Sequence, residues 1–266
     1  MKPILKYYLV LSIAIFTLTG CSKNNDDTVD PPTLPTEVEI LKQVYPDHIL
    51  GYENDKMIVT KYIYLDYDDK KEKSHIQLIN NADIQDMFLI KYKKGEAPSV
   101  IAKNDDPGRY RNERFFKAMY GNSEAEVIKN LTIITWCPKL VNQQLPVTTI
   151  NGVDKQLLKV STELDEHPEW ADYLISAGTF NWRNIAGSSM LSVHSFAIAI
   201  DLNTAYSSYW LWDYPNADEN TDIGGFINQI PQGIIDIFEK HGFIWGGKWY
   251  HYDSMHFEYR PELLTE

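Results

Sequence analysis

The stretch from Ser192 to Asp201 constrains the fold more than any other part of this chain. From Phe196 onward large and small apolar residues alternate, which predicts a strand with one bulky face and one open face. Asp201 falls on the open face, and a lone carboxylate on a strand otherwise free of charge needs a partner to offset its lost hydration. A metal ion is one such partner. His194 can join Asp201 in that site only if the chain bends between His194 and Ala197, because simple alternation would turn the two side chains to opposite faces.

A second stretch, residues 245–259, is predicted to complete the site through the pattern Asp253-x-x-His256. Two imidazoles and one carboxylate, from His194, His256 and Asp201, form a three-ligand zinc set that leaves a fourth position for water. This arrangement is typical of catalytic zinc. Asp253 lies three residues before His256 and could take the proton from that water as a general base.

The first residues of the chain read as a targeting segment. Residues 1–20 hold two lysines and a short apolar run, and the ending Leu-Thr-Gly before Cys21 resembles the bacterial lipobox. We therefore expect a lipoprotein signal peptide at 1–20 and a lipid on Cys21, which attaches the mature protein to a membrane of the bacterial cell envelope. Residues 21–37 contain three prolines and little to bury, so they are predicted to form a flexible tether.

The charge and the cysteine content of the chain limit the partners and the cysteine-based sites that we expect. Without residues 1–20 the chain keeps 23 basic and 37 acidic residues, and 23 − 37 gives a formal charge of −14. A surface this acidic repels phosphate backbones, so nucleic acid is not expected as a partner. With Cys21 lipidated, only Cys137 remains, which excludes an intrachain disulfide and a cysteine-based zinc site.

The coarse pattern of elements favours an α+β fold. Strands are predicted within residues 56–67, 75–79 and 131–136, and helices over residues 111–120, 154–164 and 231–241. Helices that cluster before and between the two metal-bearing stretches suit α+β better than a βαβ repeat. We expect one module, with residues 38–104 as its N-terminal part and residues 105–266 as its core. His48 and His75 have no partners at ligand spacing and are predicted to be surface or packing residues.

Joined to Arg183-Asn184-Ile185-Ala186-Gly187, Gly246-Gly247 and His256-Phe257-Glu258, the two metal motifs resemble the M15 group of zinc peptidases. This group comprises D-alanyl-D-alanine carboxypeptidase-like and L-alanyl-D-glutamate-peptidase-like enzymes that cut bacterial peptidoglycan stem peptides. The family's Ser-x-His-x-x-Gly-x-Ala-x-Asp motif falls on Ser192, His194, Ala199 and Asp201. Its acidic-x-x-His motif falls on Asp253 and His256, and the likeness covers most of the chain after the tether. The one departure is Ala197, where the family usually has glycine.

The resemblance implies a hedgehog/DD-peptidase-like fold, with an antiparallel sheet and flanking helices around a zinc cleft. It implies His194, Asp201 and His256 as Zn²⁺ ligands, Asp253 as the base, and Arg183 as the cation that steadies a carbonyl or a substrate carboxylate. A structural ion pair is the alternative role for Arg183.

Three further residues are candidates for substrate binding or for support of the ligands. Ser192 belongs to the first metal motif, and Glu258 shares a strand face with His256 and could orient it. His251 could line the cleft as a proton donor or carboxylate contact, or could be a surface residue.

The function expected from these features is zinc-dependent hydrolysis of peptidoglycan stem peptides, as a carboxypeptidase or endopeptidase at a bond involving a D-amino acid. Two alternatives stay open. One is a non-catalytic zinc-containing module that binds cell wall, against which the presence of Asp253 argues. The other is a dipeptidase acting on free D-Ala-D-Ala, which needs a closed pocket.

Overall fold

Three small antiparallel sheets carry the strands of residues 34–265, which are the residues described by the computed structural model. The strands are β1 (Ile49–Glu53), β2 (Lys56–Val59), β3 (Ile63–Asp66), β4 (Leu131–Trp136), β5 (Gln143–Thr148), β6 (Ala199–Asp201), β7 (Phe243–Trp245) and β8 (His256–Tyr259). The helices are α1 (Thr36–Val44), α2 (His75–Asn81), α3 (Glu113–Tyr120), α4 (Glu124–Ile128), α5 (Val153–Leu164), α6 (Trp210–Asp213) and α7 (Gln232–Lys240). The α+β class is therefore confirmed, but the strands are divided among three sheets and do not form the single antiparallel sheet that was expected.

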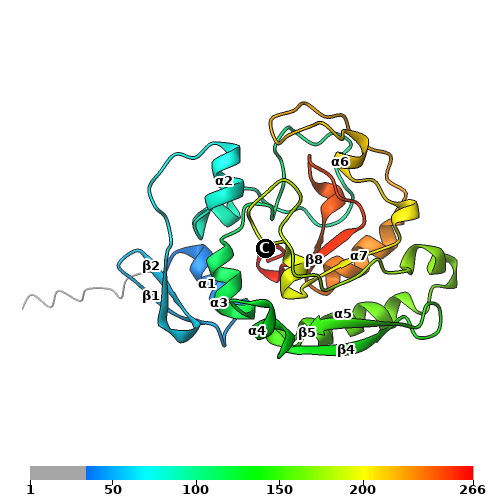
Figure 1. The fold of residues 1–266 in the computed structure, drawn as a ribbon, viewed down its shortest axis with the longest axis horizontal. Coiled ribbons are helices and arrows are strands. Elements are labelled where there is room, and N and C mark those ends of the chain that lie inside the picture. The colour runs from blue at the N-terminus through cyan, green and yellow to red at the C-terminus, as the bar shows by residue number, and fades with distance from the viewer. Residues whose placement is uncertain (1–33, 266) are drawn as a thin grey trace, which may run out of the picture. The chain divides into compact units, whose positions relative to one another are not determined.

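The sheet β6-β8-β7 holds the C-terminal part of the fold together (Figure 1). Both of its strand pairs are antiparallel, with Ala199 opposite Glu258 and Phe243 opposite Tyr259. Helix α7 packs against β7 and α5, and α5 in turn packs against the hairpin β4–β5.

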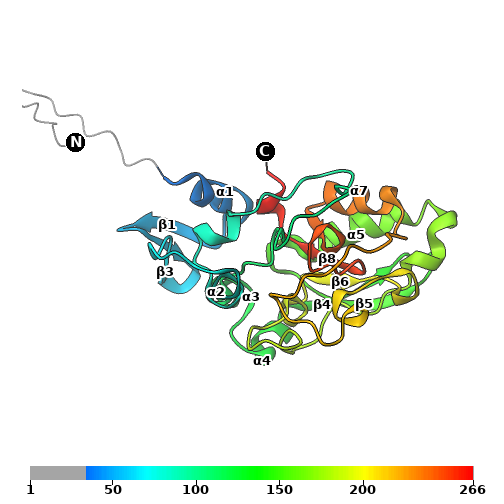
Figure 2. The ribbon, with the colours of Figure 1, turned by 90° about the horizontal axis from the view of Figure 1, so that it is seen from above.

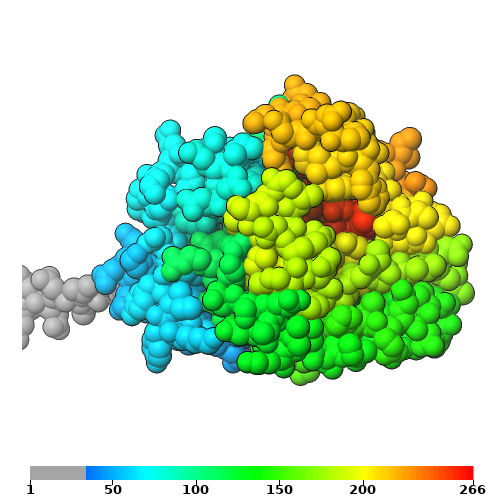
Figure 3. All heavy atoms as spheres, viewed as in Figure 1, coloured from blue at the N-terminus to red at the C-terminus, as the bar shows by residue number. Residues whose placement is uncertain are grey.

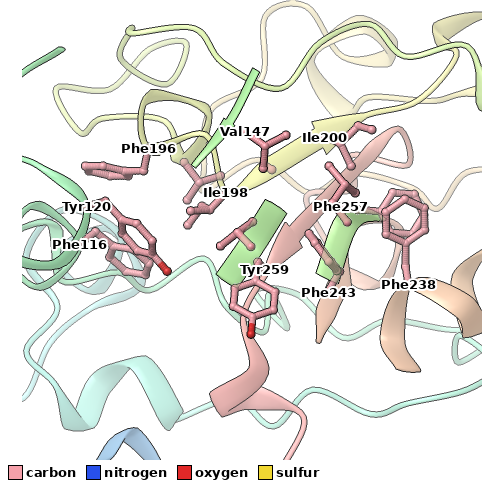
Figure 4. Packing of buried hydrophobic residues seen from close by; sticks show 14 of the residues in the cluster. Phe116, Tyr120, Val147, Phe196, Ile198, Ile200, Phe238, Phe243, Phe257 and Tyr259 are labelled. Atoms are coloured by element: carbon pink, nitrogen blue, oxygen red, sulfur yellow. The ribbon is translucent and has the colours of Figure 1, made fainter. Parts of the chain in front are cut away.

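Aromatic side chains fill one continuous core that packs against this sheet (Figure 4). Phe238 of α7 stacks on Phe257 of β8 with ring centroids 3.9 Å apart. Elsewhere in the same cluster, Phe116 of α3 stacks on Phe196 at 6.0 Å. Removing such large apolar surfaces from water is the main favourable term in folding, and the contact of Phe238 with Phe257 helps to fix the strand that carries His256.

The N-terminal sheet β1-β2-β3 and helix α1 join the rest of the chain through a buried polar network. The hydroxyl of Tyr45, just after α1, donates to Glu262 at 2.6 Å. The fully buried guanidinium of Arg260 donates to Glu258 and to the carbonyl oxygen of Gly108, each at 2.9 Å. Buried charges of this kind are tolerated because each one finds an opposite charge or a hydrogen bond.

Two local predictions are wrong. Residues 75–79 form helix α2 and not a strand, because Ser74 and Gln77 make a capping box in which the backbone N–H of Ser74 donates to Gln77 at 2.8 Å. The strand expected from Phe196 is limited to β6, since residues 193–196 form a 3₁₀ turn. The predicted bend is confirmed: Ala197 follows that turn in the left-handed region at φ 53°.

Some expectations concern residues that the structure does not describe. Residues 1–20, Cys21 and most of the predicted tether lie outside the described residues, and helix α1 begins at Thr36, within the range assigned to the tether. Residues 34–266 group as one compact unit. Within the described part of the chain, no helix has the length and apolar character needed to cross a membrane.

Candidate metal and catalytic site

The three predicted metal ligands come together at the start of β8. Asp201 and His256 are direct partners in the β6–β8 register, and His194 lies in the 3₁₀ turn before β6. His194 Nε2 lies 3.2 Å from His256 Nδ1 and 3.2 Å from Asp201 Oδ2. His256 Nδ1 lies 3.0 Å from Asp201 Oδ1. A tetrahedral zinc site with bonds of 2.0–2.1 Å has ligand separations of about 3.3 Å, so these atoms have a spacing that suits such an ion.

The turn before β6 is what brings His194 to Asp201. The hydroxyl of Ser192 accepts a hydrogen bond from the backbone N–H of His194 at 3.3 Å and so caps the turn. Ala197 ends it in a conformation that glycine adopts more easily, which costs about 1 kcal/mol for alanine. A glycine at this position would therefore avoid the backbone strain that Ala197 carries.

Hydrogen bonds on the far side of each imidazole decide which ring nitrogen carries the proton. His194 Nδ1 lies 3.0 Å from the carbonyl oxygen of Thr179 and must donate to it. His256 Nε2 lies 3.1 Å from the Glu258 carboxylate and donates there. The remaining nitrogens, His194 Nε2 and His256 Nδ1, therefore turn lone pairs toward each other and toward Asp201. Three electron-pair donors this close repel one another unless a cation lies among them, so the residues present fit a divalent metal ion.

Glu258 is held as firmly as the ligand that it orients. It is fully buried, with Arg111 3.0 Å and Arg260 2.9 Å from its two oxygens. Burial opposes its ionisation, but Arg111, His256 and Arg260 together lower the pKa of Glu258 to about 2. A charged carboxylate behind His256 is the arrangement that makes an imidazole a better metal ligand.

Without a metal, protons take part of the metal's role. Burial alone would raise the pKa of Asp201, but the two histidines beside it bring that pKa well below its usual range. Burial lowers the pKa of His256, yet Asp201 and Glu258 outweigh it and raise this pKa to about 10. The set of His194, Asp201 and His256 is therefore stabilised by a positive charge, which a proton supplies when no metal is bound.

Asp253 lies beside this set with a carboxyl group that the rest of the described chain leaves unpartnered at Oδ1. Its backbone N–H donates to Gly246 at 3.0 Å, and a Cβ on Gly246 would come within 2.6 Å of the Asp253 carbonyl oxygen. Glycine is thus required for this close approach. Burial, and then the charge of Asp201, raise the pKa of Asp253 to about 7. A carboxyl group that exchanges its proton near neutral pH is suited to general acid–base chemistry.

Arg183 is exposed and faces the same cavity. Its guanidinium donates to the neighbouring carbonyl oxygen of Asn184 at 3.3 Å and forms no ion pair within residues 34–265. The structural ion pair considered for Arg183 therefore finds no support. The backbone N–H of Ser192 donates to the Arg183 carbonyl oxygen, and the backbone N–H of Arg183 donates to the Ser195 hydroxyl, each at 3.0 Å. These bonds hold the segment along the turn that carries His194.

A second buried cluster was missed from the sequence. It consists of His75, Asp106, Glu219 and His251, whose possible ligand atoms lie within 4.8 Å of one another and could by that spacing hold a metal. His75 is thus no isolated packing residue, because its Nε2 lies 3.2 Å from Glu219. His251 is buried and is not a surface residue. The four residues are widely separated in the sequence, and no local pattern marks them.

Arg109 occupies the second cluster with a positive charge of its own. Its guanidinium donates to Asp106 at 3.0 Å and to both oxygens of Glu219, at 2.6 and 3.0 Å. This bidentate contact is among the strongest that a carboxylate makes with a side chain. The cluster therefore already has a cation, in contrast to the set around His256.

Both clusters border one cavity of about 290 Å³. On the face shown in Figure 3, the C-terminal segment (red) lies at the floor of a hollow between parts of the chain from residues 180–220 (yellow). The cavity is lined by the predicted ligands and base, by three arginines and by aromatic rings: Arg109, Arg111, Arg183, Ser192, His194, Asp201, Tyr209, Trp210, Trp249, His251, Asp253 and His256. A cavity of this size can admit a short stretch of peptide.

Residues 186–259 match a family model of the M15 peptidases described as D-alanyl-D-alanine carboxypeptidase. The matched range contains the donor set, Asp253, Glu258 and His251, whereas Arg183 and His75 lie before it. No curated protein and no solved structure matches the chain. The family is zinc-dependent, and the match implies peptidase activity on D-Ala-D-Ala peptides and a DD-peptidase-like fold.

Proposed function

We propose, taking the match over residues 186–259 as the premise, that this protein is a zinc-dependent peptidase that hydrolyses peptidoglycan stem peptides at a bond involving a D-amino acid. The observation that carries the proposal is the convergence of two imidazole lone pairs and one carboxylate beside an unpartnered buried carboxyl group. Hydrolysis with a metal uses such a ligand set to hold the ion and a nearby carboxyl group to take the proton of the attacking water.

The metal would be held by His194 Nε2, His256 Nδ1 and the Asp201 carboxylate. Zinc bound to such a set supplies a water molecule of lowered pKa and polarises a carbonyl group. Ser192 and Glu258 support this set from outside, because one caps the turn of His194 and the other accepts the ring proton of His256.

Asp253 is the proposed base. Its Oδ1 faces no hydrogen-bond donor in the described chain, so it is free to accept a proton from the attacking water and to return it to the leaving amine. Arg183, which has no ion-pair partner among the described residues, is free to contact the polarised carbonyl oxygen or a carboxylate of the substrate.

The test is digestion of purified muropeptides by the zinc-loaded protein, followed by mass analysis of the products. Asp253→Asn should lose most of its activity, and protein treated with a chelator should be inactive. Asp172→Asn, which changes an exposed aspartate away from the cavity, is the matched control. The masses reveal the bond that is cut and so separate carboxypeptidase from endopeptidase action. Binding without cleavage would favour the cell-wall-binding module, and cleavage of free D-Ala-D-Ala alone would favour the dipeptidase.

We also propose that the protein is anchored to the bacterial cell envelope by a lipid on Cys21. The support is the Leu-Thr-Gly-Cys ending of the N-terminal apolar run. Radiolabelled palmitate should enter the wild-type chain expressed in a bacterial host and should not enter Cys21→Ser. Equal labelling of both chains would contradict the proposal.

A further inference from the structure

His251 is the residue of the second cluster that borders the cavity with the predicted metal ligands. Its Nδ1 lies 2.7 Å from Asp106 Oδ2, and its backbone N–H donates to the other oxygen of the same carboxylate at 2.9 Å. Burial opposes the ionisation of Asp106, but Arg109 and His251 lower its pKa below the usual value. An ionised carboxylate can only accept, so Nδ1 of His251 carries a proton and donates it to Asp106.

The ring of His251 has little freedom to turn. It stacks on the ring of His75 at 5.5 Å between centroids, and the edges of Trp210 and Tyr250 contact it at 4.7 and 5.0 Å. Its side chain is 0% exposed. A ring fixed at Nδ1 and packed on its faces holds its second nitrogen in one direction, which is the condition for preorganised recognition.

That second nitrogen, Nε2, is buried and has no hydrogen-bond partner in the described part of the chain. A buried polar atom without a partner costs about 1–3 kcal/mol, so its persistence calls for an explanation. Asp106 and Glu219 lie on the Nδ1 side of the ring, and neither of them lines the cavity that His251 borders. Since His251 lines this cavity, a ligand bound there is the partner that we consider for Nε2.

Charge indicates what kind of ligand this is. Asp106 and Glu219 bring two negative charges to the cluster and Arg109 brings one positive charge, so these three side chains leave a net charge of −1 beside the ring of His251. His75 already uses both ring nitrogens, toward Tyr110 and Glu219. In the protonated form of His251, Nδ1–H donates to Asp106 and Nε2–H is left for the ligand.

The cavity also offers a cation to an anionic ligand. Of the three arginines that line it, Arg109 is paired with Asp106 and Glu219, and Arg111 is paired with Glu258. Arg183 forms no ion pair within residues 34–265. A guanidinium without a carboxylate partner can bind a negatively charged group of a ligand in that cavity.

We propose that His251, held by Asp106, donates from Nε2 to a carboxylate of the bound peptide, which makes it a determinant of substrate specificity. This inference rests on the proposed peptidase function and narrows it to peptides with a free carboxylate close to the scissile bond. The same Asp106–His251 pair distinguishes such a peptide from one whose carboxylate is blocked as an amide, because an amide cannot replace the negative acceptor.

The test compares two ligands that differ only in that carboxylate: Nα,Nε-diacetyl-L-lysyl-D-alanyl-D-alanine and its C-terminal amide. Binding is measured by calorimetry on the zinc-loaded full chain carrying Asp253→Asn, which slows turnover. Adding His251→Ala should weaken binding of the free peptide by about 10- to 100-fold, the value of a hydrogen bond between charged groups, and should leave the amide within twofold. His251→Gln, which keeps an N–H group, should lose less, and His167→Gln, a partly exposed histidine away from the cavity, should lose nothing.

Several results would overturn the inference. Equal weakening of both peptides by His251→Ala would indicate a structural role, and no weakening of either would exclude the contact. Failure of the parent protein to bind either peptide would also contradict it, whereas the peptidase function is judged separately by muropeptide digestion. If His251→Ala unfolds, NMR of the parent protein with ¹⁵N-labelled histidine decides: Nε2 of His251 must respond to the free peptide and not to the amide.

Discussion

Two buried clusters of histidines and carboxylates lie on one cavity, and they differ in where their positive charge comes from. In the cluster of His75, Asp106, Glu219 and His251, the Arg109 guanidinium contacts both carboxylates. In the set of His194, Asp201 and His256, two ring nitrogens and one carboxylate face one another at 3.0–3.2 Å, with no arginine or lysine of the described chain among them. The same residue types can thus form a finished ion-pair network or a metal site. The presence or absence of one arginine separates the two.

The largest expected effect is on metal content. His194→Ala should lose stoichiometric zinc, because it removes one of only three protein ligands, whereas His75→Ala should keep about one zinc per chain. Metal analysis of both purified variants and of the wild type makes this measurement. If His194→Ala retained zinc and His75→Ala lost it, the second cluster and not the first would be the metal site.

The second-largest effect is expected on turnover. Asp253→Asn should keep its zinc and lose about 10²- to 10⁴-fold in kcat, the usual contribution of a general base. The matched Asp172→Asn should keep both zinc and rate. Unchanged kcat in Asp253→Asn would remove the base from the mechanism, and a lowered Tm alone would make Asp253 a structural residue.

Arg109 tests the second cluster directly. Arg109→Met leaves the buried Asp106 and the partly buried Glu219 without their cation, and breaking a buried ion pair in this way costs about 3–5 kcal/mol of unfolding free energy. Urea unfolding of the variant and the wild type measures the loss. A loss below about 1 kcal/mol would mean that Arg109 is not the partner that the cluster depends on. Zinc titration of the same variant sharpens the contrast, since a second bound equivalent would show that the guanidinium keeps a metal out.

The pH dependence of stability should have opposite signs for the two clusters in chelator-treated protein. The folded-state pKa of His256 is about 10 against 6.5 unfolded, and that of Asp253 about 7 against 3.8. Both are raised, so their stabilisation is complete at low pH and is lost as pH rises from about 4 to about 10. The pKa values of Asp106 and Glu219 are lowered, so their stabilisation is lost only in acid.

Urea unfolding at pH 6 and pH 9 checks the sign of the pH dependence that His256 and Asp253 give to the unfolding free energy. The metal-free protein should be less stable at pH 9, and excess zinc should reduce the difference because the metal replaces the proton. Equal stability at pH 6 and pH 9 without zinc would mean that the folded protein does not hold protons on His256 and Asp253 more tightly than the unfolded chain.

The smallest effect is expected at Ala197. Glycine relieves about 1 kcal/mol of strain at φ 53° but brings more freedom to the unfolded chain, so the two terms nearly cancel. Ala197→Gly should therefore change the unfolding free energy by less than about 1 kcal/mol and the rate by less than tenfold. If it turned an inert protein into an active peptidase, the natural chain would be better described as a binding module.

The sequence predicted the donor set better than it predicted the sheets. His194 and Asp201 sit in one short motif, and the bend at Ala197 followed from the need to bring them to one side. Strand partners are set by contacts between distant segments, and β6 pairs with β8 more than fifty residues away, so the division into three sheets could not be read locally.

Two other differences between the sequence predictions and the structure have separate causes. The capping box at Ser74 and Gln77 was a local signal for a helix that the apolar alternation outweighed. For His75 and His251 no signal existed, because 144 residues separate His75 from Glu219 and only the folded chain brings them together. A histidine without a partner nearby in the sequence can therefore still belong to a charged network.

The span between His194 and His256 gives a bound metal a second consequence, in polymer terms. Cys137 is a free thiol, so no disulfide ties distant parts of the described chain. An ion held by both histidines would close a loop across 62 positions of sequence. By the chain-entropy relation for covalent crosslinks, closing a loop of this length removes roughly 4 kcal/mol of freedom from the unfolded state. The ion would thus crosslink two distant segments of the described chain, within which no disulfide does so.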